Sequence, residues 1–330
     1  MRGPLHKIPV VGIVVMAVIF GWIAFRLDWQ RTATILSSLD GHFITAAIAF
    51  FLLQLVFLAC RWYVLVNINH HYIKRVRAAR IFYFANVTNF VFLSSLSGML
   101  VRFLLSTRAG SPWVNAFCAS IADRLFSFGT LIVFAILTLP TTFARLGRID
   151  VSRSFAELIG VMMILGLGFL VYIIIYPARM KKIVGARRFR AGRAYLLRLL
   201  RSPALGLALL YSVAAQASFF LGVYFILWAS HIHISFVDMM TVLPVVAVLA
   251  SLPLTVGGWG LREGVYVVGL GLLGVSLENA FLASVQVGVF TMASALLIAI
   301  PVLMNRRFYI DLRRSAHAHD TVRSFLSTSP

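Results

Sequence analysis

A small set of charged residues lies inside long apolar stretches of the sequence. The set consists of Arg61, Arg102, Asp123, Arg124, Arg262 and Glu263. An ionised side chain at the centre of a bilayer costs about 2.5–3.5 kcal/mol on insertion scales, so such residues usually have a partner and a function. Arginine presents a planar fork of donors that fits a carboxylate or a phosphate. We therefore expect Asp123 and Glu263 to pair with arginines, and the arginines to be candidates for holding an anionic headgroup.

These residues also have purely structural interpretations. In one, Arg102 and Glu263 form a buried pair that joins two segments without touching a substrate. In another, Arg61 extends its head group to the cytoplasmic surface of the membrane. Asp123 and Arg124 point to different faces of a helix and need separate partners. The sequence has no nucleophile–base set, phosphate-binding loop or metal-ligand spacing. We expect no enzymatic activity, no catalytic cofactor and no metal.

Glycines accompany the charged residues at two places. The strings SSLSGMLVR and LTVGGWGLR, which begin at Ser94 and Leu254, both place a glycine four residues before an arginine. Glycine lets backbone N–H groups approach a ligand or a neighbouring chain closely. The predicted hinges are Gly98, Gly257, Gly258 and Gly260. Two asparagines near the first string are predicted to contact substrate or to satisfy backbone groups there, namely Asn86 and Asn89.

The composition defines the class of protein that must position these residues. Of 330 residues, 61% are hydrophobic and 12% are charged, whereas a soluble domain has about 25% charged residues. The apolar runs at 8–25, 43–66, 161–176 and 204–229 are predicted to cross a hydrocarbon core of about 30 Å. The sequence predicts an all-α polytopic membrane protein.

The net charge of +20 is concentrated at 2–7, 74–80, 179–201 and 306–323. Short loops rich in Lys and Arg are typical of the cytoplasmic side, where they face anionic lipids. We expect both termini to be cytoplasmic and no nucleic-acid partner. The run 179–201 is interpreted as a solvated loop, with direct binding of anionic lipid as the alternative.

The positions of these loops constrain the topology. If they share one side, the segments at about 81–110 and 238–277 must each return to the side from which they enter. Both are short and interrupted by glycine or charge, and irregular backbone is tolerated at membrane depth only where protein or a watery cavity covers it. We expect two re-entrant hairpins, with pairs of short full spans as the alternative.

A related string follows each hairpin segment. NAFCASIADRLFS begins at Asn115 and NAFLASVQVGVFT at Asn279. We predict a repeat of two halves, residues 1–150 and 151–305, each arranged as span, span, hairpin and span, followed by a basic cytoplasmic tail at 306–330. Because the loop charges give the halves opposite orientation, the repeat is inverted, as in many alternating-access transporters.

The stretch from Leu252 to Glu263, LPLTVGGWGLRE, resembles the signature of the flippase-like family, also known as the lysylphosphatidylglycerol synthase transmembrane region. Arg61-Trp62, the glycine and arginine of the first tip, and Asp123-Arg124 are similar to other landmarks of that family. The resemblance covers roughly residues 10–305. In two departures, Ser94-Ser95 replace a proline-containing approach and Met99 replaces a glutamate, so the first tip is less acidic.

The resemblance implies a protein that moves lipids or lipid-linked molecules between leaflets of a bacterial inner membrane. Its partners would be an anionic phospholipid, a hopanoid or a polyprenyl-linked lipid. The last 25 or so residues are too few for a soluble aminoacyl-transferase domain, so we do not expect the synthase itself. The alternative is a non-transporting scaffold that presents lipid to a glycosyltransferase or a lipid-modifying enzyme.

Overall fold

Long apolar helices form the framework of the protein. The computed structural model describes residues 38–91, 97–146, 186–251 and 260–304. Within these ranges the long helices are α3 (Gly41–Val66), α6 (Trp113–Leu146), α10 (Ala204–Ala229) and α13 (Leu277–Leu303). Each contains a stretch of 26 residues that is long and apolar enough to cross a membrane. The predicted spans at 43–66 and 204–229 are therefore confirmed as helices, whereas those at 8–25 and 161–176 lie outside the described residues.

Shorter helices occupy both segments predicted as hairpins. The first contains α4 (Arg75–Val91) and α5 (Ser97–Arg108), and the second contains α11 (Phe236–Ala250) and α12 (Leu261–Gly271). At 1.5 Å per residue these helices are about 16–26 Å long, so none alone matches a core of about 30 Å. The first segment begins earlier than the predicted residue 81, because arginine and alanine at 75–80 favour helix.

The basic run predicted as a loop also contains a helix. This helix, α9 (Ala186–Arg201), buries Tyr195 and Leu199 against the bundle. The Tyr195 hydroxyl donates to the Leu65 carbonyl at the end of α3 (3.0 Å). The interpretation as a solvated loop is thus wrong for residues 186–201, since alanine, leucine and arginine are good helix formers and one side of the helix can be buried.

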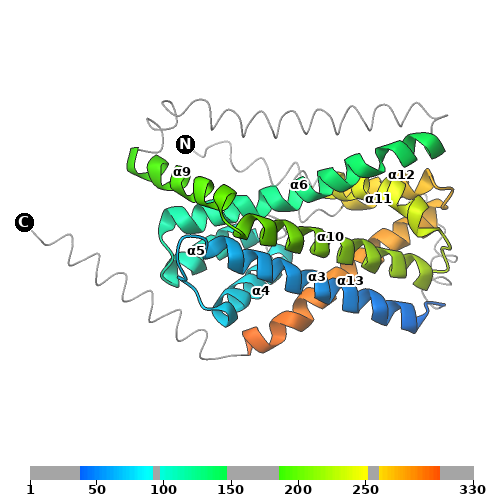
Figure 1. The fold of residues 1–330 in the computed structure, drawn as a ribbon. Coiled ribbons are helices and arrows are strands. Elements are labelled where there is room, and N and C mark those ends of the chain that lie inside the picture. The colour runs from blue at the N-terminus through cyan, green and yellow to red at the C-terminus, as the bar shows by residue number, and fades with distance from the viewer. Residues whose placement is uncertain (1–37, 92–96, 147–185, 252–259, 305–330) are drawn as a thin grey trace, which may run out of the picture.

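Hydrogen bonds between helix ends establish the directions of the long helices. The Asp40 amide, at the start of α3, donates to the Ala229 carbonyl at the end of α10 (3.2 Å). The Asn115 side chain, at the start of α6, donates to the Val66 carbonyl at the end of α3 (2.7 Å). Figure 1 shows that α3 and α13 begin at one end of the bundle, while α6 and α10 run the opposite way.

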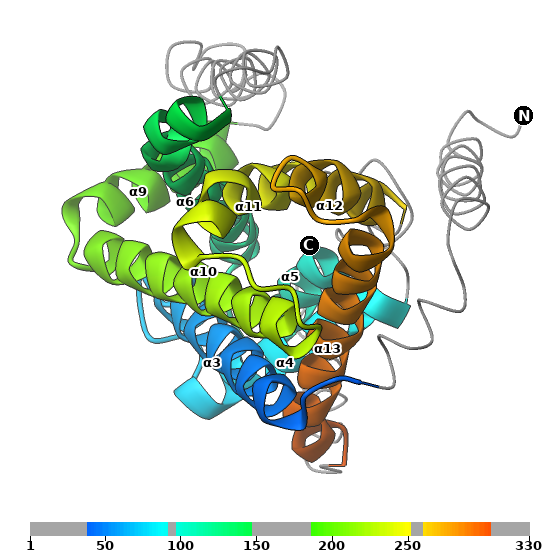
Figure 2. The same ribbon diagram turned by 90° about the vertical axis from the view of Figure 1, so that its right-hand side faces the viewer.

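The helix contacts follow a paired pattern. The most extensive contact joins α3 to α10, where the Phe51 ring fills the space that a Cβ at Gly222 would occupy. Helix α4 packs on α13, and α11 packs on α6. Helices α5 and α12 each lie against the short helix before them and the long helix after them. Figure 2, viewed along the bundle, shows α11 and α12 on the opposite side from α3.

Charges of opposite sign mark the two ends of the bundle. At the end where α3 begins, Asp40 caps α3, while Asp238 and Glu278 occupy the first turns of α11 and α13. This arrangement suits the positive partial charge of helix N-termini. We call this the acidic end. The other end, called the basic end, carries the start of α4, the end of α5 and all of α9, so the two described basic segments share one side as predicted.

Candidate functional site

Asp123 lies between two arginines that come from different helices. Its Oδ1 accepts from Nε of Arg61 on α3 (2.9 Å) and lies 2.8 Å from Nη2 of the same ion pair, and its Oδ2 accepts from Nη1 of Arg102 on α5 (2.7 Å). All three residues are buried. At 1.5 Å per residue, Asp123 is about 15 Å along α6 from Trp113, so this group lies within the candidate span. We call Arg61, Arg102 and Asp123 the first cluster.

Arg61 is fixed by further contacts along its guanidinium. Nη2 donates to the Ser127 hydroxyl on α6 (2.6 Å), and Nη1 donates to the Ser212 hydroxyl on α10 (3.0 Å). Only 1% of Arg61 is exposed. The interpretation that Arg61 extends to the membrane surface is therefore wrong, because the carboxylate and the two hydroxyls hold its head group among three helices.

Arg102 is packed between aromatic rings. Its guanidinium carbon lies 5.3 Å from the ring centre of Trp62 and 5.2 Å from that of Phe82. Such cation–π contacts stabilise a cation away from water. The Trp62 Nε1–H is buried and has no hydrogen-bond partner among the described residues, and the same holds for the Ser106 hydroxyl, one turn after Arg102. The first cluster thus adjoins two donors that the fold leaves available.

The predicted hinge at Gly98 allows close contact between α4 and α5. A Cβ at this position would lie 2.6 Å from the Ala85 carbonyl oxygen. The Gly98 amide donates to Asn89 Oδ1 (2.8 Å), and Asn89 in turn donates to Asn86 Oδ1 (3.4 Å). Asn89 therefore satisfies a backbone donor in the first turn of α5, as predicted, and Asn86 acts on it from the preceding turn of α4.

A second charged group lies nearer the acidic end. Glu263 is fully buried, and its Oε1 accepts from Nη2 and Nε of Arg262 (2.7 and 3.0 Å) and from the Ser284 hydroxyl (3.5 Å). Its Oε2 accepts from the Gly260 amide at the start of α12. We call Arg262, Glu263 and Ser284 the second cluster. Gly260 has φ of +85°, a left-handed conformation that favours glycine.

Gly288 on α13 provides the space for the Arg262 guanidinium. A Cβ at Gly288 would overlap with that group, so only glycine is compatible with this placement. In the repeated strings, Gly288 aligns with Arg124, and Ser284 aligns with Ser120. The repeat therefore relates Gly288 and Ser284 to residues beside Asp123 and one turn before it. Ser127 and Ser212 gave no signal, because serines are common in apolar helices.

The structure separates two residues that sequence reasoning joined. Arg102 pairs with Asp123 and Glu263 pairs with Arg262, so the interpretation of an Arg102–Glu263 lock is wrong. Arg124 is half-buried and, as the next residue on α6, points about 100° away from Asp123. The predicted hinges Gly257 and Gly258 lie outside the described residues.

The two clusters differ in charge. The first contains two guanidinium groups and one carboxylate, whereas the second contains one of each. Fold and site together define a multi-pass helical membrane protein with arginine–carboxylate groups packed among its long and short helices. The chain belongs to the family described as the lysylphosphatidylglycerol synthase TM region, whose sequence pattern matches residues 10–312. No curated protein matches the chain as a relative.

Proposed function

We propose that this protein is a lipid translocase that binds the polar headgroup of an anionic or lipid-linked substrate at its buried arginines. The observation that carries the proposal is the first cluster, where Asp123 is the one carboxylate that the described residues provide for two buried arginines. A buried net positive charge is costly unless it acquires a negative partner. A phosphate bound beside Arg61 and Arg102 supplies that partner.

The unpartnered donors support the same proposal. Buried polar groups without a hydrogen bond are uncommon and call for an explanation. Trp62 Nε1 and the Ser106 hydroxyl adjoin the first cluster, and the Tyr266 hydroxyl lies one turn after Glu263 of the second. Headgroup oxygens in a loaded state accept from these donors, while the lipid tails stay in the membrane. The mechanism requires no catalytic residue and no cofactor.

The two halves of the protein act as an inverted repeat in this proposal. Exchanging α3 with α10, α4 with α11, α5 with α12, and α6 with α13 turns each contact among these eight helices into another observed contact. Equivalent long helices also run in opposite directions (Figure 1). The pairs α4–α5 and α11–α12 serve as re-entrant hairpins, entered from the basic and acidic ends respectively. Rocking of one half against the other exposes the clusters to the two leaflets in turn.

The proposed location is the bacterial inner membrane, with the basic end and both termini facing the cytoplasm. Anionic lipid on that side attracts basic segments, and the positive-inside rule gives the same orientation. Substrate then reaches the first cluster from the cytoplasmic leaflet. The second cluster, which is balanced in charge, serves as the exit side, where a headgroup must bind less tightly in order to leave.

A proteoliposome assay tests the proposal. The protein is reconstituted with fluorescent phosphatidylglycerol, and the probe reaching the outer leaflet is bleached chemically to measure exchange. We expect the wild type to accelerate exchange and an Arg102→Ala, Arg262→Ala variant to lose most of that activity. Equal exchange by the two proteins contradicts the proposal. Arg193→Gln, which alters an exposed cation of α9, is the charge control.

A second variant separates transport from folding. Trp62→Phe keeps a ring beside Arg102 but removes an N–H that the described fold leaves unpartnered. Phenylalanine is smaller, so this fully buried site loses packing and some stability, whereas loss of the unpartnered donor itself costs nothing. At a temperature where the variant stays folded, we expect slower exchange. Trp113→Phe, at an exposed position of α6, is the matched control. If all variants and the wild type give the slow exchange of empty liposomes and a partner enzyme co-purifies in fixed ratio, the scaffold alternative replaces the translocase.

A further inference from the structure

Helix α9 presents cations and leucines together at the basic end of the bundle. One side of the helix is anchored by Tyr195 and Leu199. The other side exposes Leu197 by 38% and Leu200 by 55%, next to arginines at 193, 198 and 201. A helix with this mixture is typical of the membrane interface, where leucines enter the acyl boundary and arginines meet headgroups.

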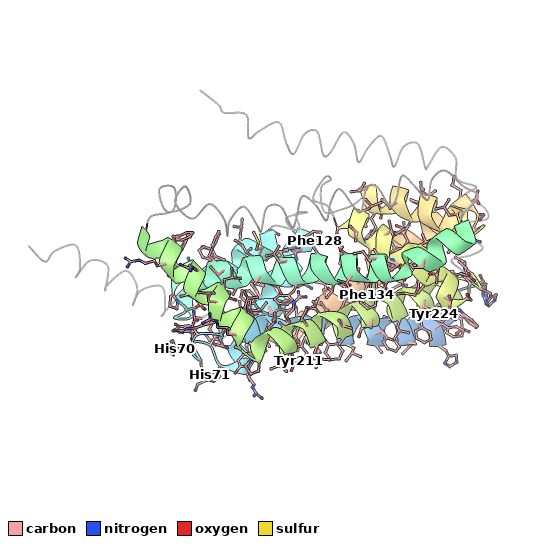
Figure 3. The ribbon with its side chains drawn as sticks, turned by 45° about the horizontal axis from the view of Figure 1, so that its top comes forward. His70, His71, Phe128, Phe134, Tyr211 and Tyr224 are labelled. Carbon is pink, nitrogen blue, oxygen red and sulfur yellow. The ribbon has the colours of Figure 1, made fainter. Side chains whose placement is uncertain are left out.

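A cavity of about 250 Å³ opens between α9, the segment after α3 and the start of α6. Its polar lining includes Asn69, His70, Asn115, Tyr195 and Arg198. Figure 3 shows His70 at the same end of the molecule as α9. The cavity is therefore open at the level where headgroups lie, and it is separate from the buried first cluster.

Hydrogen bonds orient Arg198 at the edge of this cavity. Its Nη1 donates to Asn69 Oδ1 (3.2 Å), and Asn69 Nδ2 donates to Asn115 Oδ1 (3.0 Å). Asn115 is buried and is held in turn by Ser111 and the Val66 carbonyl. The exposed guanidinium is thus tied through Asn69 to the buried Asn115.

A second cavity, of about 290 Å³, lies on the other side of Arg198. It is lined by Ile68, Leu197, Arg198, Arg201 and Ser202. Arg198 therefore belongs to both cavities, with a polar lining on one side and leucine, isoleucine and a second arginine on the other. This sequence of polar, cationic and apolar surface matches the order of groups in a phospholipid.

No carboxylate of the described residues lies close enough to balance the positive charge of these arginines. Asp40, Asp238 and Glu278 are at the acidic end, and Asp123 and Glu263 are inside the bundle. Each arginine near an anionic membrane surface contributes about 1 kcal/mol of attraction. An anionic ligand at Arg198 and Arg201 thus meets no described carboxylate that competes for these arginines.

We propose that the two cavities around Arg198 form a binding site for one anionic phospholipid of the leaflet at the basic end. The phosphate is held by Arg198 and Arg201, the headgroup occupies the cavity beside Asn69, and the acyl chains run along Leu197 and Leu200. This lipid is a bound component that fastens α9 to the bundle, distinct from the substrate of the proposed translocase.

Binding of phosphatidylglycerol to the purified full chain tests this site. Native mass spectrometry in mild detergent measures the retained lipid, with phosphatidylcholine as the zwitterionic comparison. Arg198→Gln should weaken phosphatidylglycerol binding about tenfold, since it removes a charge-assisted bond to phosphate. Arg193→Gln, which removes an equal charge from the same helix but lines neither cavity, should change binding less than twofold. Equal loss in both variants overturns the proposal, because it indicates a diffuse charge effect.

Localisation of the bound lipid provides a second readout that does not depend on a variant. Phosphatidylglycerol with a photoreactive acyl chain should crosslink within residues 195–202, and peptide mapping identifies the position. Excess unlabelled phosphatidylglycerol should abolish the crosslink, whereas glycerol 3-phosphate at the same concentration should not. Competition by glycerol 3-phosphate at equal concentration, or crosslinks elsewhere only, refutes a lipid site here.

Discussion

Replacing Asp123 by asparagine removes the carboxylate of the first cluster while keeping the shape of its side chain. Asp123 accepts one hydrogen bond from Arg61 and one from Arg102, and its ion pairs with both measure 2.7–2.8 Å. Asparagine offers one acceptor oxygen, and its NH₂ group faces a guanidinium that also donates. Breaking a buried pair on one side costs about 3–5 kcal/mol, because the other charges stay buried. We expect the Tm of the purified protein to fall by about 10 °C.

Thermal unfolding in detergent, followed by tryptophan fluorescence, measures this effect. Asp238→Asn is the control, since Asp238 is only half-buried and lies in the first turn of α11. Its loss should cost less than about 1 kcal/mol, the value of a carboxylate near a helix N-terminus. The reasoning is refuted if Asp123→Asn lowers the Tm no more than Asp238→Asn does.

A double-mutant cycle with Arg102→Met separates charge from packing. In the wild type, this change removes a partner of Asp123. In the Asp123→Asn background it removes one of two uncompensated cations. The two changes should therefore be less harmful together than the sum of their separate costs, by about 1–3 kcal/mol. Simple additivity contradicts the view that the cluster acts as one unit.

The remaining predictions concern the glycines and the second cluster. Gly288→Ala should displace the Arg262 guanidinium and cost about 1–3 kcal/mol. Gly129→Ala, with open space around its Cβ, should be neutral in thermal unfolding. Equal costs for the two variants contradict the close contact between Gly288 and Arg262. Gly98→Ala should separate α4 from α5 and increase amide exchange of α5 in mass spectrometry, since its Cβ would meet a backbone carbonyl; unchanged exchange refutes this contact. Glu263→Gln should cost about 3–5 kcal/mol by the same argument as for Asp123. It should also raise amide exchange at the start of α12, because one oxygen then has to serve both Arg262 and the Gly260 amide. A change no larger than that of the Asp238 control argues against the second cluster.

The sequence identified the charged residues of the two clusters better than it identified which of them pair with each other. Ionisable residues are rare inside apolar runs, so Arg61, Asp123 and Glu263 were identifiable by type alone. Their pairing depends on how helices far apart in the chain pack together. The Arg61–Asp123 contact joins residues 62 positions apart, and no local pattern specifies it. The apolar runs likewise located the long helices, whereas α9 was missed because its arginines outweighed its buried leucine and tyrosine.

The excess charge of the first cluster also connects the protein to the electrical state of the membrane. Two guanidinium groups and one carboxylate give the first cluster one net positive charge, and two of its residues, Arg61 and Asp123, lie on candidate spans. Moving one charge through the membrane potential is worth about 2.3 kcal/mol per 100 mV. With an inside-negative potential and the basic end inside, the field draws the empty cluster toward the cytoplasmic leaflet. In the proposed translocase, an anionic headgroup would cancel this charge, so the loaded cluster would move without opposing the field and the voltage would return the empty one.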